Sequence, residues 1–381
     1  MFKKTGALTG MLQSFKNIFY LGIKELRGLF RDYMMVVLIA YSFSLGVWVS
    51  GSASPDSLTN AVIAVVDEDR SQLSRRIIDS FQPPMFVKPV EISQVEIDPQ
   101  MDSGNYTFVL VIPHNFERDV RAGNTPEIQL NVDATRMSQA FTGSGYIQSI
   151  INQEISRFIN PSATGAEIAS TVIRNRFNPN LTQIWFSGVM QLVNNISMLA
   201  IILTGAALIK ERENGTLEHL LVMPINSFEI MVSKIWSMLV VVLAASAFSL
   251  VFIIEMMMKI PLEGSLLLYL SGVALHLFAV TSLGIFLACV AQNMPQLGML
   301  MILILLPMQM LSGSSTPRES MPGWVQDVML VAPNTHLVEL SQAILFRGAG
   351  IDIVYKQFLY LLVIGSVLFG ISLIRFRKSV A

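Results

Sequence analysis

A run of ionisable residues lies near the middle of the 381-residue chain, between two long apolar stretches. The apolar stretches, 184–209 and 235–258, are each long enough to cross a bilayer core of about 30 Å. Between them, the chain predicts a short charged loop at a membrane surface. The ionisable residues in the first part of this loop are Lys210, Glu211, Arg212, Glu213, Glu218 and His219.

The charged loop has the signals of a short helix. Gly215 is predicted to end the incoming helix, and Thr216 is a good N-cap for a helix over 217–223, which Pro224 terminates. Glu218 falls in the first turn, where a carboxylate faces the positive end of the helix dipole. Because about two turns of helix are not stable alone in water, its leucines need a surface. The lipid headgroups or a cytosolic partner would supply that surface.

The motifs of known catalytic and metal sites are absent from the sequence. It has no GxxxxGK[ST], HExxH or GxSxG pattern and no paired cysteines, since Cys289 is the one cysteine. Asp67, Asp69 and Asp133 could be metal ligands, but their spacing matches no calcium loop, and turn or cap roles are favoured. We therefore expect no catalytic residue, no metal and no cofactor in this chain.

Three polar residues interrupt the apolar stretches and are candidates for a translocation path. His276 is an ionisable residue inside a crossing, which makes it a functional candidate, although a neutral histidine packed between helices is the favoured interpretation. Asn194 and Asn195 are predicted to face protein or a polar cavity, because an amide facing lipid has no hydrogen-bond partner.

The composition indicates a membrane protein. Hydrophobic residues make up 52% of the chain, charged residues make up 14%, and the mean hydropathy is +0.55. Ordinary soluble domains have about 25% charged residues. The net charge of −1 gives no field that would attract nucleic acid, so no nucleic-acid partner is expected.

The apolar pattern predicts six crossings. Residues 1–33 are predicted to be a loose cytosolic tail over 1–10 followed by an amphipathic helix over 15–31, which would lie on the cytosolic leaflet; an amphipathic core helix is the alternative. Residues 312–356 are predicted to form re-entrant or interfacial pieces. The predicted crossings are 34–51, 184–209, 235–258, 266–290, 297–311 and 358–374, and the charged loop extends over 210–232.

Residues 52–181 have a different composition and predict a separate α/β domain. Three short apolar runs, 61–66, 106–112 and 127–132, read as strands, and they alternate with predicted helices over 73–81, 115–122 and 137–159. Lysine and arginine in the short loops place both termini and the charged loop in the cytosol. The α/β domain would then lie outside.

Several segments resemble ABC-2 type exporter permeases. ERENGTLEHLLVMPI (211–225) resembles the coupling-helix signature of that family. LSGSSTPRESMPGWVQDV (311–328) with APNTH (332–336) resembles its segment between the fifth and sixth crossings. VIPHNFERDVRAG (111–123) and NVDATRMSQA (131–140) resemble the subgroup with a large extracytoplasmic domain, which is found in Gram-negative bacteria and is related to drug-efflux permeases.

The resemblance implies a fold and a set of partners. The fold would be the six-helix ABC-2 (type V exporter-like) transmembrane domain over 184–376 with its first crossing at 34–51, an inserted extracytoplasmic α/β domain and an N-terminal interfacial helix. It implies a multi-pass inner-membrane protein among membrane lipids, paired as a homodimer or heterodimer. Each permease would engage a cytosolic ATPase that binds ATP and Mg. A periplasmic adaptor and an outer-membrane channel are further partners that the resemblance suggests.

The resemblance also implies roles for individual residues. Closure of the ATPases would push on the short helix and tilt the second and third crossings, moving a hydrophobic or amphipathic, drug-like or lipid-like substrate outward. The alternative is a membrane receptor or scaffold whose outer domain senses a ligand, but the cytosolic loops are too short to hold an output domain. The implied coupling residues are Glu211, Glu213, Gly215, Thr216, Glu218 and Leu221.

Overall fold

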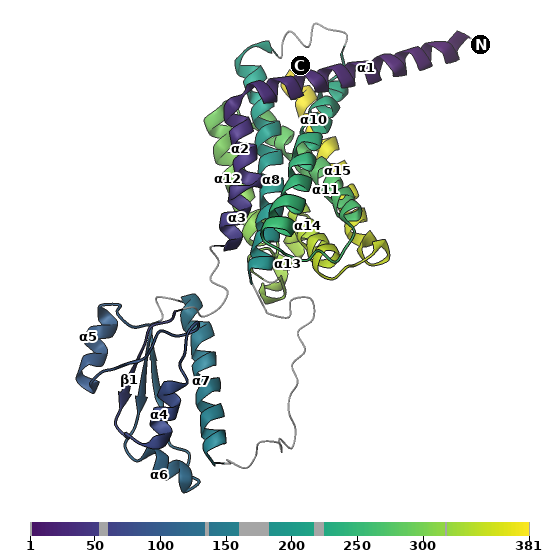
Figure 1. Cartoon of the computed structure of the whole chain (residues 1–381). Helices are drawn as coiled ribbons and strands as arrows, with labels where there is room; N and C mark the ends of the chain where they lie inside the picture. The colour runs from purple at the N-terminus through teal and green to yellow at the C-terminus, as the bar shows by residue number, and fades with distance from the viewer. Residues whose placement is uncertain are drawn as a thin grey trace. The chain divides into compact units, whose positions relative to one another are not determined.

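The chain folds into two compact units, which Figure 1 shows in a computed structural model. The model describes residues 2–52, 60–133, 137–159, 183–216, 225–316 and 318–380, with side chains described from residue 12 onward in the first range and from 143 in the third. One unit comprises Met1–Ser54 with Gln183–Ala381 and is called the helical unit below. The other comprises Pro55–Thr182 and is called the α/β unit.

The α/β unit contains a four-stranded sheet of order β2-β1-β3-β4. β1 (Ile63–Asp67) pairs in parallel with β2 (Val90–Glu91) and β3 (Phe108–Ile112), and β4 (Gln129–Val132) pairs antiparallel with β3. β1 and β3 are continuous apolar runs because both faces of a parallel sheet are covered. β2 was not predicted from the sequence, since two residues are too few to show an alternating pattern.

Helices cover both faces of this sheet. On one face, side chains from α4, α6 and α7 pack over Ile63, Phe108 and Leu110. On the other face, side chains from α5 pack over Ala64 and Val109. Three of these helices correspond to predicted ones, whereas α5 was not predicted. The helices are α4 (Gln72–Asp79), η1 (Gln94–Glu96), α5 (Ile97–Asp102), α6 (Phe116–Arg121) and α7 (Met137–Ile159).

Two of the three aspartates considered as metal ligands, Asp67 and Asp69, have turn and cap roles. Asp67 accepts hydrogen bonds from the Asp69 N–H at 3.1 Å, the Arg70 N–H at 2.9 Å and the Ser74 hydroxyl at 2.8 Å. Asp69 accepts one from the Glu117 N–H at 3.0 Å. These bonds fix the turns at the carboxyl ends of β1 and β3.

The helical unit begins with α1 (Phe2–Arg31), which runs across one end of the bundle (Figure 1). The prediction of a loose tail over residues 1–10 is wrong, since the helix begins at Phe2. α2 (Tyr33–Phe43) and α3 (Leu45–Ser52) follow, separated by a break at Ser44.

The remaining elements form the bundle and the cap at its other end. α8 and α11 are its most buried long helices, whereas α2, α3 and α15 expose much of their apolar surface. The elements are α8 (Gln183–Glu213), α10 (Ser227–Phe248) with its π-helical continuation η2 (Ser249–Met257), α11 (Leu266–Val290), α12 (Met294–Met310), η3 (Arg318–Ser320), α13 (Gly323–Met329), α14 (Pro333–Ser341), η4 (Gln342–Phe346) and α15 (Ile351–Val380).

Within the described residues, five helical stretches are long and apolar enough to cross a membrane: 33–52, 184–213, 227–257, 266–290 and 351–378. The shorter α12 is also apolar, and Pro307 lies within it.

Several helices extend beyond the predicted crossings. α8 continues to Glu213 and α10 begins at Ser227, so the predicted loop 210–232 is wrong for residues 210–213 and 227–232, which are helical. α15 likewise extends over 351–380 where 358–374 was predicted. Hydropathy marks the apolar part of a helix, and it misses ends whose charged side chains find partners on neighbouring helices. Glu211 and Glu213 therefore lie on a helix and not in a loop.

Candidate functional site

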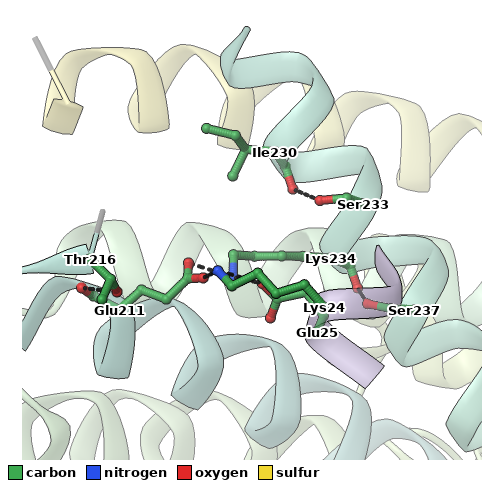
Figure 2. Close-up of polar contacts among 8 residues, drawn as sticks. All are labelled: Lys24, Glu25, Glu211, Thr216, Ile230, Ser233, Lys234 and Ser237. Carbon is green, nitrogen blue, oxygen red and sulfur yellow. Dashed lines mark hydrogen bonds and ion pairs between the residues drawn. The ribbon is translucent and has the colours of Figure 1, made fainter. Parts of the chain in front are cut away.

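Four charged side chains meet where α1, α8 and α10 come together (Figure 2). Lys234 Nζ lies 2.6 Å from Glu211 Oε2 and 3.0 Å from Glu25 Oε1. Lys24 Nζ lies 2.7 Å from Glu211 Oε1 and 3.8 Å from Glu25 Oε1. Each lysine thus contacts both glutamates. We call these four residues the ionic joint.

The ionic joint is largely removed from water. The Lys234 side chain is 2% exposed, Glu25 is 10% exposed and Glu211 is 11% exposed. Two cations balance two carboxylates, as burial requires, because an uncompensated charge costs several kcal/mol to bury. Burial raises the pKa of the Glu25 carboxyl, with Lys234 opposing the shift and the Glu211 carboxylate adding to it.

Further polar contacts hold α1 to the bundle. Glu229, in the first turn of α10, accepts hydrogen bonds from Ser14 Oγ at 2.6 Å and Asn17 Nδ2 at 3.1 Å. Lys210 at the end of α8 pairs with Asp32 at 2.9 Å, and this hydrogen bond lowers the pKa of Asp32. These contacts therefore hold α1 to the bundle near both ends of the part of the helix whose side chains are described.

An aromatic contact completes the fit between α1 and α10. The Trp236 indole N–H donates to the Ile18 carbonyl at 3.1 Å, and its ring stacks on Phe19 with centroids 5.9 Å apart. A Cβ atom on Gly22 would lie 2.1 Å from the Trp236 ring. Gly22 therefore provides the space into which the indole fits.

The end of α8 is also bonded to α11 and α12. Arg212 Nη1 donates to the carbonyls of Ala288 at 3.2 Å and Ala291 at 2.8 Å, which lie at the C-terminus of α11. Glu213 Oε1 accepts from the Met294 N–H at 3.1 Å, at the N-terminus of α12. Charged side chains thus satisfy backbone groups that the helix ends leave free.

The predicted turn comes directly after the end of α8. Gly215 has φ of +67°, a left-handed conformation that ends a helix and favours glycine. The Thr216 hydroxyl donates to the Glu211 carbonyl at 3.1 Å. Asn226 donates its N–H to Glu229 at 3.4 Å, at the start of α10. Glu218, Leu221 and the predicted short helix over 217–223 lie outside the described residues.

A second polar group lies inside the bundle and is neutral; we call Asn194, Ser197, His276 and Asn334 the polar network. Ser197 Oγ lies 2.8 Å from His276 Nε2 and donates to Asn334 Oδ1 at 2.6 Å. Asn334 Nδ2 lies 3.5 Å from Asn194 Oδ1. These bonds join α8 and α11 to the start of α14, and His276 is fully buried.

Asn195 belongs to a separate contact. Its Nδ2 donates to the Ser42 carbonyl at 2.6 Å, and its Oδ1 accepts from Gln191 at 2.9 Å. Ser42 lies just before the break between α2 and α3, where the regular ladder of backbone bonds is interrupted. Of the three candidate path residues, Asn194 and His276 share one network, and Asn195 bonds to α2.

Lys24, Glu25 and Lys234 were not predicted to be functional residues. Two signals were present. Lys234 directly precedes the apolar run that starts at residue 235, and an ionisable residue there needs a partner. Glu25 is the only acidic residue in 1–31.

The chain matches a model of the ABC-2 family of transporter proteins over residues 32–374. It is 57% identical over 370 residues to the inner membrane transport permease YhhJ of Escherichia coli (strain K12), which covers 97% of this chain and 99% of that protein. It is 27% identical over 362 residues to the probable multidrug ABC transporter permease YbhR of the same organism, covering 94% and 97%.

These matches extend over nearly the whole chain, and they confirm the resemblance inferred from the residues. The chain therefore belongs to the ABC-2 family of transporter permeases, as a membrane transport subunit that has no catalytic site of its own and works with an ATPase partner.

Proposed function

We propose that the chain is the membrane-spanning subunit of an ATP-binding cassette exporter that moves a hydrophobic or amphipathic substrate, drug-like or lipid-like, out of the cytoplasm or the inner membrane. The name of YbhR, a probable multidrug ABC transporter permease, supports a substrate of this class. Membership in a permease family does not favour the alternative of a receptor or scaffold.

The proposed topology has six crossings, with α12 as the fifth and α15 as the sixth. Both termini face the cytosol, and the α/β unit faces the periplasm. Support comes from the end of the bundle where α1 lies, because cytosolic segments near crossings carry an excess of lysine and arginine. The described cations at that end are Lys16, Lys24, Arg27, Arg31, Lys210, Arg212, Lys234, Arg375, Arg377 and Lys378.

The observation that carries the proposal is the position of the ionic joint on both sides of residues 214–226. Glu211 lies just before this segment on α8, Lys234 lies just after it on α10, and Glu25 links both to α1. A force on the segment would therefore move α8, α10 and α1 together, as in a rigid-body switch.

We assign the docking of the ATPase to this segment. Glu211 and Glu213 fasten the segment to the bundle, and Gly215 provides its turn. Thr216, Glu218 and Leu221 would form the surface that the ATPase contacts. The ATPase would bind ATP and Mg, and a second permease, identical or different, would complete the transporter. A periplasmic adaptor and an outer-membrane channel would receive the cargo.

Of the candidate path residues, we retain Asn194 for the path. It is half-buried, whereas Asn195 and His276 are buried and have hydrogen-bond partners within one subunit. We therefore propose that Asn195 and His276 position helices and do not contact substrate.

The first test is purification of the tagged chain in mild detergent, with mass spectrometry and an ATPase assay. Recovery of a P-loop ATPase with vanadate-sensitive activity is expected. Absence of any ATPase from well-folded protein would contradict the proposal.

The second test changes the coupling segment. Glu213→Ala/Glu218→Ala should leave membrane insertion intact and abolish transport-stimulated ATP hydrolysis. The matched control is Glu255→Ala/Glu263→Ala, which removes two exposed glutamates from the opposite end of the bundle. Normal stimulation in the first variant would refute the assignment of the segment.

A further inference from the structure

The outward face of α1 carries an apolar stripe. Leu12, Phe15, Phe19 and Phe30 are exposed by 60%, 69%, 48% and 63%. At 3.6 residues per turn, these positions fall on one side of the helix, next to the side that packs on α10. So much exposed aromatic surface on one helix indicates an interaction surface.

A basic stripe runs beside the apolar one. Lys16, Arg27 and Arg31 are exposed, and none of them forms an ion pair within the described part of the chain. They extend over about 22 Å of helix at 1.5 Å per residue. In the described part of the chain no acidic side chain pairs with them, because Glu25, the only acid in 1–31, pairs with Lys234, and the following Asp32 pairs with Lys210.

The apolar stripe leads into the exposed apolar surface of α2. Phe30 is followed within one turn by Tyr33 and Met34, which are 84% and 81% exposed on α2. α2 and α3 together form one of the stretches long enough to cross the membrane. An apolar stripe beside a basic one, joined to a crossing, is the pattern of a helix lying in the membrane interface.

We propose that the outward face of α1 binds anionic phospholipid, with Lys16, Arg27 and Arg31 contacting the headgroup phosphates and the aromatic stripe entering the acyl boundary. The uncompensated cations select the lipid, because a headgroup without net charge provides little field to attract them. Because α1 is bonded to Glu229 and Trp236 of α10, lipid bound to α1 would also stabilise the position of α10. This inference rests on membership in a membrane-permease family and is independent of coupling to an ATPase.

The test uses the purified full-length chain in detergent, titrated with phosphatidylglycerol or phosphatidylcholine of the same acyl chains. Native mass spectrometry measures the bound lipid. The variant is Lys16→Gln/Arg27→Gln/Arg31→Gln. The matched control, Arg75→Gln/Lys88→Gln/Arg118→Gln, removes three exposed cations from the α/β unit.

The wild-type chain should prefer phosphatidylglycerol, with each cation contributing up to about fivefold in affinity. The α1 variant should lose at least about tenfold of that affinity and most of the preference, whereas the control keeps both. Added salt should weaken the wild-type preference. A second variant, Phe15→Ser/Phe30→Ser, should weaken binding of both lipids.

Three results would overturn the proposal. The first is an unchanged preference in the α1 variant, and the second is an equal loss in the control. The third is loss of a co-purified protein from the α1 variant while lipid binding is unchanged, which would mark the face as a protein-docking surface.

Discussion

The ionic joint and the polar network both bury polar side chains among three helices, and α8 contributes to each. The joint holds two lysines and two glutamates where α1, α8 and α10 meet. The network joins α8, α11 and α14 through neutral groups, with Ser197 and His276 fully buried. The charged group thus lies at the end of the bundle and the neutral one lies within it.

This difference follows from the cost of burial. A charge is tolerated at the bundle end because Lys24 is 51% exposed and keeps part of the joint in contact with water. Deeper in an apolar bundle, neutral hydrogen bonds satisfy polar groups at lower cost. Loss of one member should therefore unbalance charge in the joint and leave only unpaired hydrogen-bonding groups in the network.

The largest effect is expected for Lys234→Met, which leaves the buried carboxylates of Glu25 and Glu211 with only the half-exposed Lys24 as a counter-charge. Breaking a buried ion pair by removing one partner costs about 3–5 kcal/mol. Thermal unfolding of the detergent-purified chain measures the loss. The control is Lys210→Met, which removes the exposed partner of Asp32 and should cost less than about 1 kcal/mol. Equal melting temperatures of the two variants would show that the buried charge of Lys234 contributes no more to stability than the exposed charge of Lys210.

A smaller effect is expected for Ser197→Ala in the polar network. It leaves His276 Nε2 and Asn334 Oδ1 without their Ser197 partner, and each unsatisfied buried group costs about 1–3 kcal/mol. The control is Ser366→Ala, whose exposed hydroxyl bonds only to the Leu362 carbonyl of its own helix. If both variants melt alike, the network adds nothing to the stability of the bundle.

Two glycines of α1 sharpen the comparison by isolating its packing from its charges. Gly22→Ala puts a methyl group into the Trp236 ring and should cost about 1–3 kcal/mol, the usual range for overpacking. Gly28→Ala meets no atom within 4 Å and should stabilise the helix by up to about 1 kcal/mol. Hydrogen exchange of α1 measures both. Slower exchange in both variants would contradict the fit described for Gly22.

The smallest effect is expected at Asp32, whose pKa is lowered by the hydrogen bond from Lys210. A lowered pKa gives stability that is present above the unfolded value near 3.8 and is lost as pH falls through the folded value. Asp32→Asn should therefore cost less than about 1 kcal/mol at pH 7 and nothing in strong acid. Melting temperatures across this pH range provide the check, and a pH-independent difference would rule out the ion pair as its cause.

The local features of the fold could be predicted from sequence, since they depend on neighbouring residues. The apolar run 266–290 coincides with α11, and Gly215 has the predicted left-handed conformation that ends α8. Helix ends were predicted less well, because the charged end of α8 has partners on other helices, such as Lys234 for Glu211 and the Met294 N–H for Glu213.

The partners themselves could not be predicted. Lys234 was visible beside an apolar run, but its pairing with Glu25 requires α1 to pack on α10. His276 was visible inside a crossing, but its partner Ser197 lies on another helix and has no sequence signature. Tertiary packing decides both, and periodicity along the chain contains no information about it.

The most direct measurement compares permease-dependent ATP hydrolysis in the wild type and in the variant Glu25→Gln/Glu211→Gln/Lys234→Met, each purified with the ATPase that accompanies it. Replacement of all three groups removes the buried charges of the joint and leaves Lys24, which is 51% exposed and can be solvated by water, so the variant should melt within about 2 kcal/mol of the wild type. If the ionic joint links the segment 214–226 to α1, α8 and α10, the variant should bind its ATPase and lose the stimulation of hydrolysis by substrate. Full stimulation in this variant would contradict the account.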